Sequence, residues 1–232
     1  MRTIFTFILA VIVVACQTKP KHNTTVSGYI KGLQKGTLYL QKIQDTAYIT
    51  LDSIVINKEQ EFELGCDLKE PEVLYLTLSE AIDAERILFF SNSAGTTTIN
   101  TTLKRFTSDA KIEGGKQQAL LEEYNTNLVR FKDKELELLE TSLNAQRLGK
   151  DSLLNSSENQ REMNLKRQYL YTINFAVNNS NSEVAPYVAL ADVYAAKITF
   201  LDTIYNSLSP TIANSKYGRM LDQYIRDIKS DN

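Results

Sequence analysis

Few residues in the chain could carry chemistry. There are two cysteines, Cys16 and Cys66, and one histidine, His22, among 232 residues. His22 lies in a polar stretch near the N-terminus, before the first predicted strand. A Ser-His-Asp or Cys-His site and a histidine-bearing metal site are therefore both excluded from the predicted folded part. We expect no catalytic residue and no metal.

Carboxylates lie close together in sequence at three places: Glu122-Glu123, residues 133–135 and residues 137–140. All three fall on a predicted amphipathic helix, where a solvated face is the simpler interpretation and a general acid/base pair the alternative. The chain contains neither a P-loop nor a Gly-x-Gly-x-x-Gly motif, so a nucleotide cofactor has no support in the sequence. We expect no cofactor of any kind.

The N-terminus has the layout of a secretory signal peptide. Arg2 supplies a positive charge, and residues 3–15 form an uncharged and mostly apolar run. That run is shorter than the roughly 20 residues that a membrane-crossing helix needs. We therefore expect residues 1–15 to be removed rather than retained as an anchor.

The signal peptide ends in Val13-Val14-Ala15-Cys16, which resembles the lipobox of bacterial lipoproteins. The resemblance implies that the Cys16 thiol receives a diacylglycerol group and that acyl chains such as palmitate hold the protein on a membrane. Residues 16–25 then form a lipidated tether whose lysines favour a periplasm-facing position on the outer membrane. The alternative is an ordinary signal peptide in which Cys16 is incidental.

Cys66 has no partner in the chain if Cys16 carries lipid, although export would place it in an oxidising compartment. It could be a reactive or intermolecularly paired thiol. Its neighbours Leu64, Gly65 and Leu68 favour the other interpretation, a small buried apolar residue.

Residues 26–115 consist of short β-rich segments separated by turn residues. Alternation of apolar and polar side chains, as in Leu38 and Leu40 against Tyr39 and Gln41, indicates antiparallel strands with one buried face. No helical period interrupts the segments, so we predict an antiparallel β-sandwich or barrel. The predicted strands are residues 26–32, 37–43, 47–56, 61–68, 73–78, 86–90, 96–103 and 111–114.

Residues 116–232 change to a helical period. A long amphipathic helix over 116–148 and a second over 158–177 are expected to form a hairpin, and the further predicted helices are residues 184–196, 198–208 and 212–228. Residues 121, 124, 128, 131, 135 and 138 approximate a heptad seam. Because Glu135 interrupts it, a packed helix is favoured over an oligomerising coiled coil. The predicted fold class is α+β.

Composition limits the possible partners. Hydrophobic residues make up 43% of the chain and the net charge is −2, which is ordinary for a folded protein. Because there is no excess of basic residues to neutralise phosphates, nucleic acid is not expected as a partner.

The segments Gly28-Tyr29-Ile30-Lys31-Gly32, Thr37-Leu38-Tyr39-Leu40, Leu51 to Ile56, Phe62 to Gly65 and Ile112 to Gly115 resemble a domain of unknown function that precedes the thioredoxin-like domain of many Gram-negative lipoproteins. The resemblance continues through Leu121 to Tyr124, Asn178 to Ser182, Leu201 to Leu208 and Ser215 to Gly218. In those relatives a Cys-x-x-Cys motif carries the redox chemistry. This chain contains no such motif, so no catalytic residue transfers.

The sequence thus predicts a noncatalytic, lipid-anchored cell-envelope protein that serves as a binding or accessory module. Its expected partners are the membrane, through Cys16, and a thioredoxin-like or other envelope protein. One alternative is a subunit of a thiol-disulfide redox enzyme, or an accessory to a separate thioredoxin-like protein. A second is a glycan- or lipid-binding module, whose structural sign would be a deep apolar or aromatic pocket.

Overall fold

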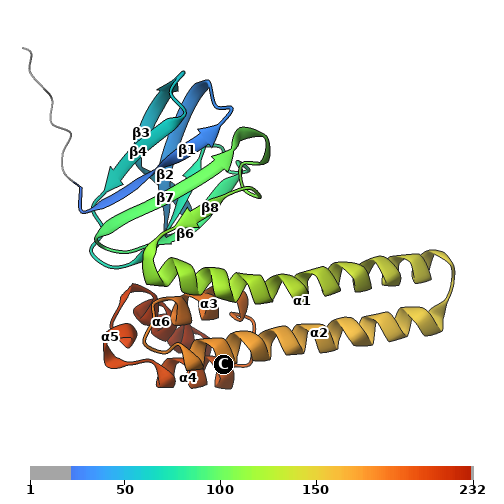
Figure 1. Cartoon of the computed structure of the whole chain (residues 1–232). Helices are drawn as coiled ribbons and strands as arrows, with labels where there is room; N and C mark the ends of the chain where they lie inside the picture. Colours follow the sequence, from blue (N-terminus) through green and yellow to red (C-terminus); the bar gives the residue numbers. More distant parts are fainter. Residues whose placement is uncertain (1–21, 231–232) are drawn as a thin grey trace, which may run out of the picture.

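Alternating apolar residues build two four-stranded sheets that pack face to face. The computed structural model describes residues 22–230. The first sheet has the order β4-β1-β7-β8 and the second the order β3-β2-β5-β6 (Figure 1). The strands are β1 (Thr24–Lys31), β2 (Lys35–Gln44), β3 (Ala47–Asn57), β4 (Glu61–Cys66), β5 (Glu72–Thr77), β6 (Arg86–Ser91), β7 (Gly95–Thr102) and β8 (Lys111–Glu113), with the short 3-10 helix η1 (Leu103–Arg105) after β7.

The core between the two sheets is filled by every second residue of the strands. Leu38 and Leu40 of β2 and Val26 and Ile30 of β1 are completely buried, as is Ile99 of β7. This is the alternation that a two-layer sheet structure requires. The predicted sandwich is confirmed, and the barrel is not formed, because the strands pair as two separate sheets.

One strand pair departs from the predicted antiparallel arrangement. β1 pairs antiparallel with β4 on one side but parallel with β7 on the other, with Thr24 opposite Gly95 and Lys31 opposite Thr102. Between β1 and β7 the chain crosses to the second sheet for β2 and β3, returns for β4, and crosses again for β5 and β6. Parallel pairing needs such a long connection, which local alternation does not reveal.

β1 begins at Thr24, two residues before the expected start of the folded part. Asn23 explains the difference, because its side chain exchanges two hydrogen bonds with the backbone of Leu68, at 2.8 and 2.9 Å. These bonds hold the chain at the end of the sheet. Cys16 and the rest of the expected tether up to residue 21 lie outside the described residues.

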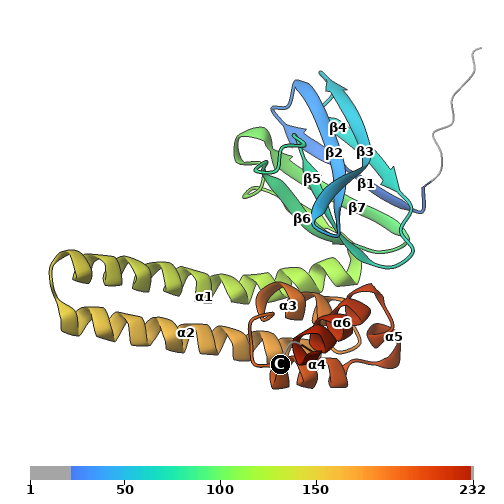
Figure 2. The same ribbon diagram turned by 180° about the vertical axis from the view of Figure 1, so that it is seen from behind.

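The helical region contains the expected long hairpin, whose far end projects away from the rest of the molecule in both views (Figures 1 and 2). The shorter helices gather at the base of the hairpin, below the sandwich. The helices are α1 (Gly115–Arg147), α2 (Asp151–Asn178), α3 (Val184–Asp192), α4 (Ile198–Ser207), α5 (Pro210–Ala213) and α6 (Lys216–Ser230).

Three of the predicted helices differ from the structure. α3 ends at Asp192 instead of residue 196, because the backbone leaves the helical conformation at Val193, with φ −130° and ψ 20°. α2 begins at Asp151 instead of residue 158, because Gly149 turns the chain within three residues at a φ of +63°. The last predicted helix is divided into α5 and α6. Ser215 lies at the break, where its hydroxyl donates to the Ile212 carbonyl and contacts the Glu183 carboxylate.

The heptad-like seam on α1 packs within the same chain. Leu121, Tyr124 and Leu128 are buried in the helical core, and the ring of Tyr124 stacks on that of Tyr171 of α2, with centroids 5.5 Å apart. The packed-helix interpretation is therefore confirmed for this seam.

A second hydrophobic core, separate from the one between the sheets, joins the sandwich to the helices. Val73 of β5 and Phe90 of β6 point away from the sandwich interior and pack among the helices. The Val73 amide donates to the Tyr217 hydroxyl at 2.8 Å, and the Phe90 amide donates to the Gln118 side-chain carbonyl at 2.8 Å. Both bonds are buried, so the outer face of the second sheet is fixed against α1 and α6.

Candidate functional site

His22 lies beside the end of β4, close to Cys66 in space, but the two side chains do not form a pair. The His22 ring lies 3.2 Å from the carboxylate of Asp67, whereas the Cys66 side chain lies in the core of the sandwich. Asp67 follows the end of β4, and its side chain is 68% exposed, whereas Cys66 is 5% exposed. No Cys-His pair is formed.

Cys66 is buried, as its apolar neighbours in the sequence predicted. Only 5% of its surface is exposed. Burial, reinforced by the nearby carboxylates of Asp67 and Glu72, raises the pKa of the Cys66 thiol to about 11. Because the thiolate is the reactive form, this environment disfavours redox chemistry.

We expect Cys66 to react slowly with a thiol reagent in the folded protein and rapidly after unfolding. The measurement is the rate of labelling by a chromogenic disulfide at neutral pH, with and without denaturant, on a chain that begins at Gln17 and therefore has one cysteine. A folded-state rate within about tenfold of the unfolded rate would contradict the buried assignment, because a tenfold difference corresponds to about 1.4 kcal/mol of local opening and exposing a buried core side chain should cost more.

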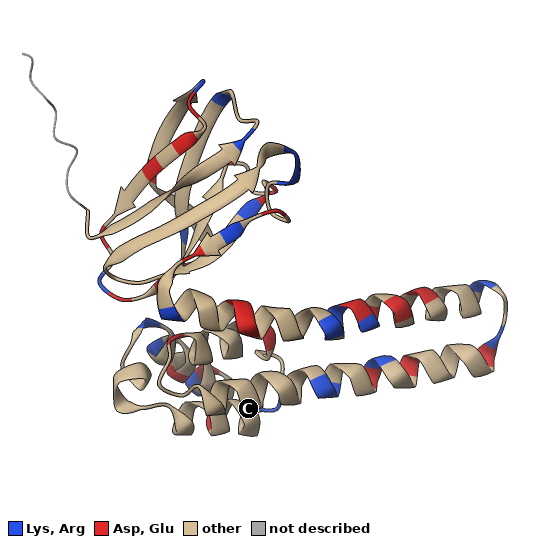
Figure 3. Ribbon diagram, viewed as in Figure 1, with Lys and Arg blue, Asp and Glu red and all other residues tan. Residues whose placement is uncertain are grey.

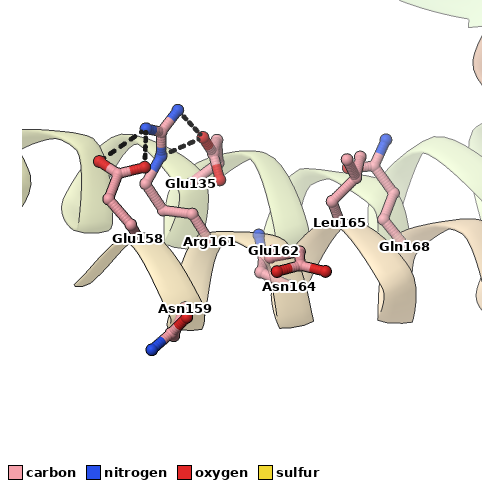
Figure 4. Close-up of a pocket in the computed structure, with 8 residues that line it drawn as sticks. All are labelled: Glu135, Glu158, Asn159, Arg161, Glu162, Asn164, Leu165 and Gln168. Atoms are coloured by element: carbon pink, nitrogen blue, oxygen red, sulfur yellow. Dashed lines mark hydrogen bonds and ion pairs between the residues drawn. The ribbon is translucent and has the colours of Figure 1, made fainter. Parts of the chain in front are cut away.

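In each of the three acidic segments of α1, one carboxylate has a partner within the hairpin: Glu122 accepts from Gln118, Glu135 pairs with Arg161 and Glu137 pairs with Lys134. Arg161 of α2 binds Glu135 at 2.7 Å and Glu158 at 3.1 Å, in a hollow of about 510 Å³ between the two hairpin helices (Figure 4). Glu137 pairs with Lys134 at 2.8 Å. Basic and acidic residues are interspersed along both helices (Figure 3). The Arg161–Glu135 pair links α1 to α2, and the guanidinium of Arg161 is occupied by the two carboxylates.

A larger cleft opens where the second sheet meets α3 and α6. Its volume is about 660 Å³, within the range of small-molecule sites. One wall comes from β2, β5 and the β2–β3 turn, and the other from α3 and α6. The lining residues are Lys42, Ile43, Gln44, Asp45, Glu72, Val73, Tyr75, Tyr187, Leu190, Ala191, Lys216, Tyr217 and Met220.

A buried carboxylate with two cations lies in this cleft. The Glu72 side chain is 9% exposed, and it forms ion pairs with Lys216 and, at 3.7 Å, with Lys42. A buried carboxylate needs such partners, because an unpaired charge is costly to remove from water. The cluster therefore holds two ammonium groups against one carboxylate.

Aromatic rings form much of the cleft wall. Tyr187 packs edge-on against Phe90 and against Tyr217, with centroids 5.8 and 5.2 Å apart. The Tyr217 hydroxyl is occupied by the Val73 amide. The hydroxyls of Tyr187 and Tyr75, by contrast, have no hydrogen-bond partner within residues 22–230.

Both unpaired hydroxyls stay protonated near neutral pH. Burial raises the pKa of Tyr75 to about 12 and also raises that of Tyr187. A neutral phenol can donate one hydrogen bond and accept another. The cleft thus offers two free donors between apolar walls, which is an arrangement suited to binding.

The sequence alone did not reveal this cleft. Its polar cluster joins Lys42, Glu72 and Lys216, which are dispersed over most of the chain. The local signal is Glu72 at the start of β5, directly before Val73 and Leu74. A charged residue there indicates a partner but does not identify it.

The sandwich that forms the sheet wall of the cleft matches a known family of domains. Residues 24–121 match the family model described as Domain of unknown function (DUF4369). The DUF4369 match covers the whole sandwich and the first turns of α1, which confirms the expected domain of unknown function. It ends before α3 and α6, which form the other wall. No curated protein and no solved structure matched the chain significantly.

Two further observations concern the described part of the chain. Within residues 22–230, no helix combines the length and apolar character needed to cross a membrane. In the same range, no three His, Cys, Asp or Glu side chains gather as the ligands of a metal ion would.

Proposed function

We propose that the protein is a noncatalytic cell-envelope lipoprotein whose DUF4369 sandwich and helical region together form a binding module. The observation that carries this proposal is the cleft at their junction, where two tyrosine hydroxyls without partners face the same cavity as an ionic cluster. Within residues 22–230 these hydroxyls form no hydrogen bond to the protein, so each is free to donate to a ligand in the cleft. A concave site with apolar walls and a few converging polar groups is the usual form of a small-molecule site.

The proposed anchor rests on the sequence Val13-Val14-Ala15-Cys16 at the end of an apolar run. A lipid on Cys16 would hold the protein on the membrane, with the sandwich following within a few residues, because β1 begins at Thr24. The lysines after Cys16 favour the periplasmic side of the outer membrane.

The anchor is tested by replacing Cys16 with serine in the full chain expressed in a Gram-negative host. We expect Cys16→Ser to move from the membrane fraction to the soluble periplasmic fraction, or to accumulate as precursor, because serine offers no thiol for the lipid. Detergent partition and gel mobility are the measurements. Cys66→Ser is the matched control, which should remain membrane-bound. A Cys16→Ser protein with unchanged mobility and membrane association would refute the anchor.

The redox alternative has less support from the structure. Cys66 is buried and its thiol pKa is raised to about 11, and the single histidine of the chain, His22, pairs with Asp67. An accessory role beside a separate thioredoxin-like protein remains compatible with the proposal, since it requires a binding surface and no chemistry from this chain.

A further inference from the structure

We infer that the junction cleft binds an amphipathic anion, a molecule with an apolar chain or ring body and a carboxylate or phosphate head. This inference rests on the proposed binding function and specifies its ligand class. It follows from three properties of the lining: apolar walls, an excess of positive charge in the ionic cluster, and hydrogen-bond donors without partners.

The apolar walls come from both sides of the cleft. Ile43 lies on the sheet side, and Leu190, Ala191 and Met220 lie on the helix side. Ile43 is 40% exposed and Met220 is 48% exposed, although both border a concavity. A ligand with an apolar body would remove these surfaces from water, at about 25 cal/mol per Å² of buried apolar area.

The head group is predicted from charge. Glu72 accepts from Lys216 in a close ion pair, while the Lys42 ammonium lies at a longer 3.7 Å from the same carboxylate. One carboxylate cannot neutralise two ammonium groups. Lys42 can therefore bind a second anion, because its ion pair with Glu72 is the longer of the two and little is lost if it weakens. Asp45 also borders the cleft, but it lies exposed in the β2–β3 turn, where water screens its charge.

The free hydroxyls of Tyr75 and Tyr187 complete the site. Anionic oxygens accept hydrogen bonds from phenols more strongly than neutral oxygens do. A sugar would need planar polar side chains on several sides for its hydroxyls, whereas this cleft has them on its sheet side alone, at Gln44, Asp45 and Glu72. The lining therefore favours an amphipathic anion over a glycan.

The test measures binding by isothermal titration calorimetry to a chain that begins at Gln17, which retains every described residue. The probes are decanoate, decyl phosphate, decan-1-ol and maltohexaose. We expect decanoate or decyl phosphate to bind, decan-1-ol to bind at least about tenfold more weakly because it lacks the charge, and maltohexaose not to bind.

Substitutions then locate the binding. Lys42→Met keeps the aliphatic stem and should weaken anion binding by about tenfold, whereas Lys134→Met on α1 should not change it. Met220→Glu places a charge in the apolar wall and should abolish binding. Met163→Glu is its control, since Met163 is 51% exposed on α2 and lies outside the cleft.

The outcomes separate the two levels of the proposal. If maltohexaose binds and Met220→Glu abolishes that binding, the cleft is a binding site but the anion assignment is wrong. If no probe binds, or if Lys42→Met and Met220→Glu bind as tightly as the unmodified chain, the amphipathic-anion assignment is refuted. The membrane fractionation of Cys16→Ser tests the anchor independently of either result.

Discussion

Replacing Gly28 with alanine is expected to prevent the sandwich from forming. A Cβ atom at this position would lie 1.8 Å from the carbonyl oxygen of Ile99, in the neighbouring strand β7. Backbone cannot move aside as a side chain can, so β1 and β7 would have to separate. Because both are central strands of the first sheet, we expect a loss of more than about 4 kcal/mol in the free energy of unfolding.

Urea unfolding followed by circular dichroism, on the chain that begins at Gln17, measures this loss. Gly149→Ala is the control, since Gly149 lies at a φ of +63° in the hairpin turn and a Cβ atom there would have no neighbouring atom within 4 Å. That substitution should cost only about 1 kcal/mol. Similar midpoints for the two variants would show that β1 and β7 do not approach as closely as described.

The second large effect is expected at Tyr217. Its ring packs against Phe90 and Tyr187, and its hydroxyl accepts the amide hydrogen of Val73. Tyr217→Ala should lower the free energy of unfolding by about 3 to 5 kcal/mol, through the cavity that it creates. Tyr217→Phe keeps the ring and leaves the buried Val73 amide without its acceptor, which should cost about 1 to 3 kcal/mol.

Tyr205→Phe serves as the matched control for the hydroxyl. Tyr205 also packs against the helical core, but its hydroxyl forms no hydrogen bond within residues 22–230. Removing it should therefore change the free energy of unfolding by less than about 0.5 kcal/mol. If Tyr217→Phe is equally neutral, the Val73 amide does not depend on Tyr217, and the junction between sheet and helices is held by apolar packing alone.

The strands were predictable because each carries its own signal. Leu38 and Leu40 of β2 alternate with polar residues, and only one register buries them together. The parallel pairing of Thr24 with Gly95 has no such signal, since it depends on how the intervening strands travel between two sheets. A local pattern of apolar and polar residues is enough to predict a strand, whereas the pairing of two strands distant in sequence depends on the path of the chain between them.

The candidate site was less predictable than the fold for a related reason. Cys66 could be assigned from its apolar neighbours, and the structure agrees. The cleft residues are far apart in the sequence and share no motif: Lys42 is in β2, Glu72 in β5 and Tyr187 in α3. Taken alone, each is an ordinary residue of its strand or helix. They share a cleft only because the outer face of the second sheet rests on α3 and α6.

The position of β1 has a mechanical consequence. β1 is the first strand after the N-terminal residues, and it is hydrogen-bonded on both sides, to β4 and to β7. A force applied at the N-terminus would pull along β1 and load both rows of hydrogen bonds in shear, so that many must break together. A chain held by its N-terminus against a moving surface would therefore resist being pulled open, whereas an edge strand at the same position would be held by one row of hydrogen bonds instead of two.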